Sequence, residues 1–243
     1  MSVHRSAEAF GDAAAAYDRG RPDYPPDAVD WLARTLDLAP GRTVVDLAAG
    51  TGKMTRALAR TRARVVAVEP SDGMRALIAG EALAGTAEEI PLGDGSADAV
   101  CVAQAFHWFA NERALREIHR VLRPDGRLAL VWNRRDLSAP AHAELDRMFA
   151  PYQGDTPRHR HGTWRAAMEA TDLFAPLGSF EVAFDQRHDV AGYVERAAST
   201  SFIAALPDAE RERLLAEVEA IGRRLGEPIV LPYVSELFAY ERR

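Results

Sequence analysis

The stretch Thr43-Val44-Val45-Asp46-Leu47-Ala48-Ala49-Gly50-Thr51-Gly52 decides the fold. Its first five residues are β-branched or apolar around one acid, which predicts a short buried strand over 43–47. Two glycines follow, and glycine tolerates a tight turn and lets a ligand approach the main chain closely. Helical spacing resumes at Met54 and Leu58. The stretch therefore predicts a strand, a turn and a helix whose first N–H groups face a polar ligand.

Short apolar runs and helical spacing continue to alternate on both sides of this stretch. We expect helices over 29–36, 54–59, 71–79 and 112–122, and strands over 64–69, 83–86, 98–104 and 127–132. The turn Pro124-Asp125-Gly126 is expected to separate the last helix from the last strand of this set. Strands that alternate with helices predict an α/β fold with a doubly wound, mostly parallel sheet.

The last hundred residues are less regular. We expect a helix over 141–152, a polar loop over 156–162, a strand over 180–187, helices over 190–200 and 208–225, and one or two strands over 229–240. No repeat or low-complexity segment interrupts the chain. The helices of this part are predicted to form a substrate cap rather than a second core.

Composition limits the classes of function. A chain of 243 residues fits one α/β domain, and 30 Lys and Arg against 36 Asp and Glu argue against a nucleic-acid partner. A few arginines still permit a small acidic substrate. The single cysteine, Cys101, excludes an internal disulfide and suits a reducing compartment. No run approaches the ~20 apolar residues of a membrane span, and the N-terminus lacks the pattern of a secretory signal. We therefore expect a cytoplasmic protein without a membrane partner.

Glu69 adds a second feature at the same edge of the sheet. It ends the second predicted strand, 17 residues after Gly52, and should lie beside the tip of the first strand. A carboxylate at this place can accept both ribose hydroxyls of a nucleoside cofactor.

With these two features the sequence resembles the class I S-adenosylmethionine-dependent methyltransferases over residues 10–135. Val44–Gly52 looks like the cofactor loop of that family, and Val66–Ser71, followed by Met74, looks like its acidic ribose motif. Further segments match in the same order: Gly85–Pro91 resembles the adenine-contacting segment, Ser96–Val100 and Val121–Leu128 resemble the fourth strand and the turn into the fifth, and Tyr17–Pro25 and Ala103–Phe109 resemble the branch with trans-aconitate methyltransferase-like enzymes.

The resemblance implies a seven-stranded, Rossmann-like sheet with an antiparallel last strand and helical cap insertions. It implies a single domain over 1–243, with an N-terminal lid (1–25), a cofactor-binding half (26–135), and substrate-cap insertions with closing strands (136–243). The implied cofactor is S-adenosyl-L-methionine, with S-adenosyl-L-homocysteine as product. Its predicted ligands are Tyr17, Arg21, Asp46, Ala48, Gly50, Thr51, Gly52, Glu69, Pro70, Met74, Thr86, Ala87, Glu88, Gln104 and His107.

Two positions depart from the family pattern. Ala48 stands where the family usually has a glycine, which leaves less room for the methionine part of the cofactor. Thr86 replaces a frequent aspartate, so the adenine amino group is expected to meet Glu88 or main-chain carbonyls instead. In the lid, Arg21 suits a carboxylate because its guanidinium can bind one with two parallel hydrogen bonds.

His107 is the candidate catalytic residue, because an imidazole after the fourth strand can act as a general base. A hydrogen-bonded wall residue is the alternative. Substrate-binding candidates are Tyr24, Trp108, Arg134 and Tyr233, with Arg135 beside Arg134 as a further contact for an acidic substrate. The His159-Arg160-His161 spacing lacks acidic or cysteine neighbours, so we expect a solvated loop and no metal.

Together these features predict methyl transfer to a small molecule, with an oxygen nucleophile (a carboxylate or phenol) as the acceptor. Methylation of carbon or nitrogen, and a non-catalytic cofactor-binding module, are the alternatives. An NAD-dependent dehydrogenase is disfavoured because residues 48–52 lack the usual three-glycine pattern. The protein is expected to be a monomer or homodimer.

Overall fold

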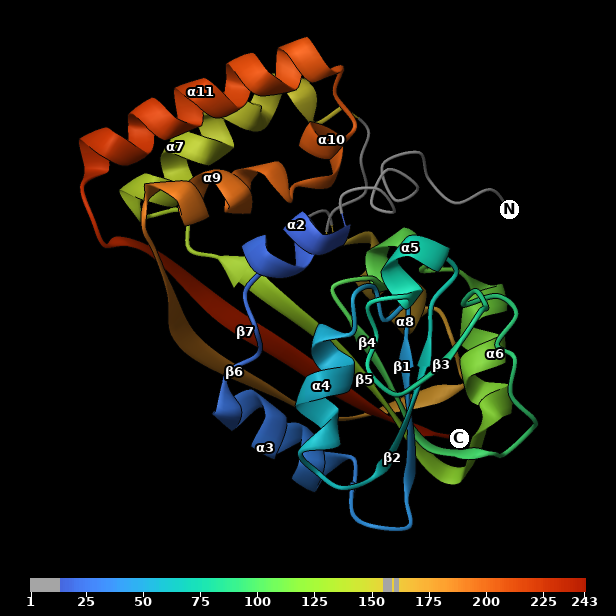
Figure 1. Cartoon of the computed structure of the whole chain (residues 1–243). Coiled ribbons are helices and arrows are strands. Elements are labelled where there is room, and N and C mark those ends of the chain that lie inside the picture. The colour runs from blue at the N-terminus through green and yellow to red at the C-terminus, as the bar shows by residue number, and fades with distance from the viewer. Residues whose placement is uncertain (1–13, 155–158, 160–161) are drawn as a thin grey trace. The chain divides into compact units, whose positions relative to one another are not determined.

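The computed structural model describes residues 14–154, 159 and 162–243 (Figure 1). The helices are α2 (Ala14–Gly20), α3 (Pro26–Thr35), α4 (Lys53–Ala59), α5 (Asp72–Arg75), α6 (Glu112–Val121), α7 (Pro140–Phe149), α8 (Thr163–Glu169), α9 (Val190–Ala198), α10 (Ser201–Ala204) and α11 (Asp208–Leu225), with 3-10 helices η1 (Phe106–Trp108) and η2 (Ala150–Tyr152). The strands are β1 (Thr43–Leu47), β2 (Arg64–Val68), β3 (Glu81–Leu83), β4 (Ala97–Ala103), β5 (Leu122–Arg135), β6 (Phe174–His188) and β7 (Ile229–Arg242).

The strands form one seven-stranded sheet in the order β3-β2-β1-β4-β5-β7-β6. β1 pairs in parallel with β2 and with β4, so that Asp46 lies opposite both Ala67 and Cys101. β2 with β3 and β4 with β5 are parallel as well. The predicted doubly wound α/β fold is confirmed, and the strand order reverses beside β1, where open α/β sheets bind their ligands. The antiparallel direction of the last strand stays a prediction.

The chain divides into two compact units, and the division falls inside β5, β6 and β7. The described residues of the sheet unit are 23–133, 159, 162–182 and 235–243. Those of the helical unit are 14–22, 134–154 and 183–234. Each unit has its own core, so the expectation that the helices of the last hundred residues form no second core is wrong.

In the sheet unit, neighbouring residues of a strand point to opposite faces. Val45 packs in one core cluster with Ile118 of α6, whereas Val44 packs in another with Leu32 of α3 and Leu58 of α4. Figure 1 shows α6 on one side of β1 and β2, and α3 and α4 on the other. This double coverage explains why the central strands are apolar along their whole length.

The helical unit contains α2, α7, α9, α10 and α11. Its core includes Phe149, Tyr193, Val218 and Tyr233, all of which are buried. The Tyr193 hydroxyl donates a hydrogen bond to the carbonyl of Ala141 at 2.8 Å, which satisfies the one polar atom of this large buried ring.

Several predicted boundaries differ from the structure; β6, for example, begins at Phe174 instead of at residue 180. Three of the differences have a local reason. The helix predicted over 71–79 begins correctly, with Ser71 capping it, but it ends at Arg75 after a first turn that contains Gly73. The third strand covers 81–83 instead of 83–86, because the chain turns at Gly85, where a Cβ would lie 2.5 Å from Pro91 Cδ. β5 begins at Leu122, and the predicted turn at 124–126 is an irregularity within it, since Ala97 pairs with Leu122 and Ala99 with Arg127.

Two predictions concern membranes and metals. No helix in the described ranges is long and apolar enough to cross a membrane. Among the residues that the structure describes, no group of three or more His, Cys, Asp or Glu is arranged to hold a metal ion. The polar loop predicted over 156–162 lies outside the described residues apart from His159 and Gly162, and so do Arg160 and His161. The prediction of a solvated His159 is wrong, because its ring lies 4.5 Å from the Trp132 ring, between centroids, and its Nε2 lies 3.3 Å from Glu236 Oε2.

Candidate functional site

The turn after β1 brings the main chain to the edge of the sheet. Ala48, Gly50 and Gly52 all have left-handed backbone conformations, with φ of 57°, 58° and 81°. Gly52 precedes α4, and a Cβ there would lie 3.2 Å from Ile78 Cγ1. Thr51, between the two glycines, is buried. The turn therefore takes the form that the sequence predicts, with an alanine in a conformation that favours glycine.

Glu69 closes the other side of this turn. It is buried; its Oε2 accepts a hydrogen bond from the Gly50 amide and its Oε1 accepts one from the Ser71 amide, both at 2.9 Å. Burial raises the pKa of Glu69, and the two amide hydrogen bonds oppose this rise. Each carboxylate oxygen keeps a second lone pair for a ligand hydroxyl.

Pro70 and Met74 complete this side of the site. Pro70 follows Glu69 directly, and the Met74 side chain is buried, with its sulfur 3.8 Å from the position that a Cβ on Gly50 would take. The structure thus brings three predicted cofactor residues together: Gly50 from the turn after β1, Glu69 directly after β2, and Met74 of α5.

Asp46 lies on β1 just before the turn and is 1% exposed. Its Oδ2 accepts a hydrogen bond from the Thr55 hydroxyl at 2.6 Å, whereas its Oδ1 is buried and has no hydrogen-bond donor among the described residues. Burial raises the pKa of Asp46 to about 7, and the charge of Glu69 adds to this rise. A buried carboxylate oxygen without a donor is costly, so this atom suits a positively charged ligand group.

A third group of predicted residues follows β3 and β4. Thr86 and Glu89 exchange main-chain hydrogen bonds at 3.3 Å, which folds Thr86, Ala87 and Glu88 into a tight turn. The Glu88 carboxylate accepts a hydrogen bond from the side-chain amide of Asn111, which also caps α6. Gln104, directly after β4, has a left-handed φ of 61°. Such backbone strain in a non-glycine residue is common at ligand sites.

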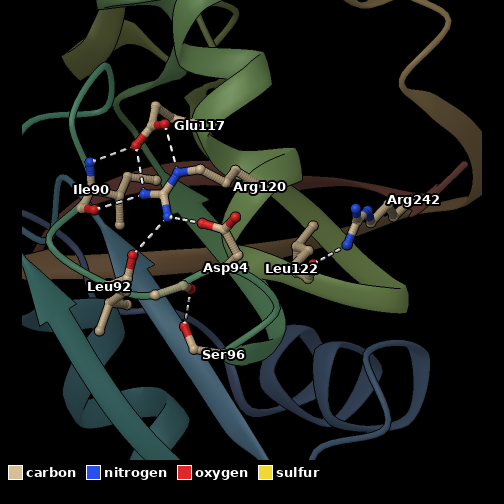
Figure 2. A network of polar contacts seen from close by, with 9 residues as sticks. Ile90, Leu92, Asp94, Ser96, Glu117, Arg120, Leu122 and Arg242 are labelled. Atoms are coloured by element: carbon tan, nitrogen blue, oxygen red, sulfur yellow. Dashed lines mark hydrogen bonds and ion pairs between the residues drawn. The ribbon is translucent and has the colours of Figure 1, made fainter.

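Arg120 of α6 anchors the segment that follows this turn (Figure 2). Its guanidinium donates to the carbonyls of Ile90 and Leu92 at 3.0 and 2.8 Å, and to the carboxylates of Asp94 and Glu117. Glu117 in turn accepts a hydrogen bond from the Ile90 amide. The mutual attraction lowers the pKa of Glu117 and raises that of Arg120. The network fixes residues 90–94 to α6.

His107 lies in η1, directly beyond β4. The Trp132 indole N–H donates a hydrogen bond to His107 Nδ1 at 3.2 Å. Because Nδ1 accepts this bond, a neutral His107 carries its hydrogen on Nε2. The Trp108 ring lies 5.2 Å from the His107 ring, between centroids. Trp132, which the sequence analysis did not name, therefore decides the tautomer of the candidate catalytic residue.

The remaining predicted residues have different surroundings. Tyr24 packs against the core cluster of α3 and α4 in the sheet unit. Tyr17, Arg21, Arg134 and Tyr233 belong to the helical unit. There, the Arg21 guanidinium lies over the Tyr17 ring, 4.9 Å from its centroid. Tyr233 is buried, and Arg134 is exposed.

Arg196 is a polar residue of the helical unit that the sequence analysis missed. It is 5% exposed, and its Nε donates to the Tyr233 hydroxyl at 2.7 Å. A signal was present, because Arg196 falls on the apolar face of the predicted helix, three residues after the buried Tyr193.

Comparisons with known proteins agree with this geometry. A family model described as a methyltransferase domain matches residues 45–130. An uncharacterized methyltransferase of Mycobacterium tuberculosis is 40% identical over 238 residues, which cover 93% of this chain and 92% of the relative. A solved structure from Anaeromyxobacter dehalogenans, described as a candidate type II methyltransferase, matches this chain with a TM-score of 0.67 and 25% sequence identity. The match covers 92% of this chain and 97% of that one.

A third comparison concerns the fold alone. The geranyl diphosphate C-methyltransferase of Streptomyces coelicolor, solved with S-adenosyl-L-homocysteine, matches with a TM-score of 0.51 and 18% identity, covering 89% of this chain and 76% of that one. The family model, the relative that is 40% identical over 93% of this chain, and the similar solved structure lead to one conclusion. The chain belongs to the methyltransferases and is an enzyme of the class I S-adenosylmethionine-dependent type.

Proposed function

We propose that this enzyme transfers the methyl group of S-adenosyl-L-methionine to an oxygen nucleophile of a small molecule and releases S-adenosyl-L-homocysteine. The observation that carries the proposal is the buried Asp46 Oδ1, which has no donor among the described residues and lies on the strand that leads into the left-handed turn. The ammonium group of the cofactor supplies the donor and the positive charge that this oxygen lacks.

The residues at the carboxyl ends of β1 and β2 fit the rest of this cofactor. The turn at Gly50 leaves the main chain open to close approach, and Glu69 keeps a lone pair on each oxygen for the ribose hydroxyls. We assign Thr86, Ala87 and Glu88 to the adenine. Tyr17 and Arg21 stay the proposed partners of the cofactor carboxylate. The other proposed contacts are Ala48, Thr51, Gly52, Pro70, Met74, Gln104 and His107.

The bound cofactor supplies an electrophilic methyl group on a sulfonium. The contribution of the chain is to hold the two reactants in line and to exclude water from them. Main-chain turns and buried carboxylates suit this task because they are fixed before the ligand arrives. We propose Tyr24, Trp108, Arg134 and Tyr233 as residues that position the acceptor.

The Trp132 hydrogen bond bears on the choice of acceptor. Because the lone pair of Nδ1 accepts the Trp132 hydrogen bond and a neutral imidazole then carries its hydrogen on Nε2, His107 suits a hydrogen-bond donor better than a group that removes a proton. A carboxylate acceptor needs no base, since it is already deprotonated at neutral pH. A phenol needs one. The geometry therefore favours a carboxylate over a phenol, and it favours His107 as a hydrogen-bond donor over a general base.

Calorimetric titration with S-adenosyl-L-homocysteine tests the cofactor site. We expect the wild type to bind, and Asp46→Asn and Glu69→Gln each to weaken binding by about tenfold or more. Glu81→Gln is the matched control, because Glu81 lies on β3 and pairs with Arg64 at an exposed position. Failure of the wild type to bind, or equal weakening in the control, would contradict the proposal.

Labelled S-adenosyl-L-methionine and a panel of acceptors test the reaction. A methylated product that alkali cleaves to methanol supports a carboxylate acceptor. A product that resists alkali supports methylation of carbon, nitrogen or a phenol. Tight binding of the cofactor without turnover of any acceptor would favour the non-catalytic module.

Composition supports our proposals for the class of acceptor and for the cellular location of the enzyme. The net charge of −6 argues for a small-molecule acceptor over a nucleic acid, and the single cysteine agrees with a reducing, cytoplasmic location. A monomer or homodimer remains the proposed state.

A further inference from the structure

Three arginines of the helical unit lie close together. Arg21 follows α2, Arg135 ends β5 and Arg196 lies on α9. Arg21 Nη2 donates to the carbonyl of Ser199 at 2.9 Å, and Arg196 Nη1 donates to the hydroxyl of the same residue at 3.4 Å. Arg135 and Arg196 are close enough for the charge of one to affect the other. We call Arg21, Arg135 and Arg196 the arginine cluster.

The cluster contains more positive than negative charge. Arg135 forms an ion pair with Asp146 at 2.9 Å. Among the described residues, no other carboxylate forms an ion pair with the cluster. Arg196 donates to the Tyr233 hydroxyl and to Ser199, and Arg21 to the Ser199 carbonyl, all of them uncharged acceptors. Three guanidinium groups against one carboxylate leave two positive charges.

These charges are poorly solvated. Arg196 is 5% exposed, and the Arg135 side chain is 22% exposed. Arg21 Nε is buried and has no acceptor in the described part of the chain. Burial lowers the pKa of Arg21 to about 10, and the neighbouring charges of Arg196 and Arg135 contribute to that shift. Buried like charges are costly unless an anion neutralises them.

The two neighbouring histidines, His142 and His188, add no negative charge, and burial together with the charge of Arg196 lowers the pKa of both. His142 is fully buried, and burial together with the charges of Arg196 and Arg135 lowers its pKa to about 3, so it is neutral near pH 7. The Tyr233 hydroxyl accepts its hydrogen bond from Arg196, and its own hydrogen has no acceptor among the described residues. It is therefore a further donor for an anion.

We propose that Arg135, Arg196 and Tyr233 bind an anionic oxygen group, a carboxylate or a phosphate, of the methyl acceptor. This inference rests on the proposed function, which assigns Arg21 to the carboxylate of the cofactor. That group neutralises one of the two positive charges, and the anion of the acceptor neutralises the other. A planar guanidinium can bind either group with two parallel hydrogen bonds.

The test measures binding in the full chain saturated with S-adenosyl-L-homocysteine, with succinate and inorganic phosphate as separate probes. We expect one or both anions to bind the wild type and raise its unfolding temperature. Arg196→Gln and Arg135→Gln should each weaken that binding by about tenfold or more. Arg187→Gln is the control, because Arg187 lies on β6 and is exposed beside Asp185. Binding of succinate alone identifies a carboxylate, and binding of phosphate alone identifies a phosphate.

Two results would overturn the inference. One is that neither anion binds the wild type, or that both variants bind as well as the control. The other is that Arg196→Gln and Arg135→Gln weaken S-adenosyl-L-homocysteine but not 5′-methylthioadenosine, which lacks the amino-acid part, because the cluster would then serve the cofactor alone. Failure of the proposed function is a different result, since S-adenosyl-L-homocysteine itself would not bind. Arg135→Gln, at the more exposed position, keeps the test valid if Arg196→Gln does not fold.

Discussion

Ala48 has a left-handed backbone, with φ of 57°, at a position where the resembling family usually has glycine. This conformation costs a residue with a Cβ about 1–2 kcal/mol. Glycine removes the cost but loses about 0.5–1 kcal/mol through the freedom of the unfolded chain. We therefore expect Ala48→Gly to raise the free energy of unfolding by about 0.5–1 kcal/mol in urea titrations.

Ala49→Gly is the matched control, since φ of Ala49 is not positive. It should lower the free energy of unfolding by about 0.5–1 kcal/mol, because a glycine gives the unfolded chain more conformational freedom to lose on folding. If both variants lose stability equally, the strain at Ala48 is not real.

The hydrogen bond from Trp132 to His107 makes a second prediction at the scale of single residues. If His107 donates through Nε2, His107→Gln should retain kcat/KM within about threefold, because glutamine keeps an N–H donor, whereas His107→Leu should lose about tenfold or more. The measurement is kcat/KM with the acceptor found by the screen. A general base would give equal losses in both variants, together with a falling rate below the pKa of the base.

Single residues also show what the sequence predicts well. Asp46 and Glu69 were predicted because each ends a recognisable strand of a parallel sheet, and their positions follow from the fold class. Trp132 and Arg196 act through partners distant in the chain, His107 and Tyr233. Neither pairing has a local sequence signal, because it depends on how the strands and helices pack.

At the scale of elements, α6 holds the 90–94 segment through Arg120. The guanidinium satisfies two main-chain carbonyls and two carboxylates at once. We expect Arg120→Met to lower the free energy of unfolding by about 2–3 kcal/mol, since several charge-assisted hydrogen bonds are lost. We also expect weaker binding of S-adenosyl-L-homocysteine, because the proposed adenine turn at 86–89 loses its anchor.

Arg116→Met is the control on the same helix. Arg116 pairs with Glu112 at an exposed position, where such pairs contribute about 0.3–0.5 kcal/mol. Chemical denaturation and calorimetry measure both variants. Equal losses in the two variants would show that Arg120 does not anchor the segment.

The sequence predicts the bounds of an element well where its pattern runs without interruption between clear breaks. The strand over 43–47 and the helix over 208–225 have the predicted bounds, because each has an uninterrupted pattern between clear breaks. The helix after Ser71 ends early and the third strand is displaced, both near glycines whose effects depend on tertiary contacts such as that of Gly85 with Pro91. α2, α8 and α10 were not predicted as helices, and they span 7, 7 and 4 residues.

At the scale of the whole molecule, the two units contain buried groups with opposite responses to acid. The pKa of His142, in the helical unit, falls from 6.5 to about 3, so the folded state binds its proton less well than the unfolded state. The contribution of neutral His142 to the free energy of unfolding is fully present above pH 6.5 and is lost as the pH falls towards 3. The pKa of Asp46, in the sheet unit, rises from 3.8 to about 7, so its contribution is present at low pH and is lost as the pH rises through 7.

Acid should therefore weaken the helical unit before the sheet unit. Between pH 8 and pH 5, His142 alone costs about 2 kcal/mol, which corresponds to about thirtyfold more frequent opening. Hydrogen exchange by mass spectrometry, corrected for the intrinsic pH dependence, should show this loss of protection in α7 and α9 but not in β1.

His142→Gln isolates the cause of this response. Glutamine can keep a donor to the carbonyl of Pro232, which His142 Nε2 contacts at 3.0 Å, but it does not titrate. The variant should therefore lose the part of the acid dependence that His142 causes, whereas His188, whose pKa is also lowered by burial and by the charge of Arg196, keeps its own part. His119→Gln is the control, because His119 lies on α6 in the sheet unit, and it should leave the dependence in place. Equal loss of protection in α7 and β1 on acidification, or an unchanged response in His142→Gln, would contradict the assignment of acid sensitivity to this buried imidazole.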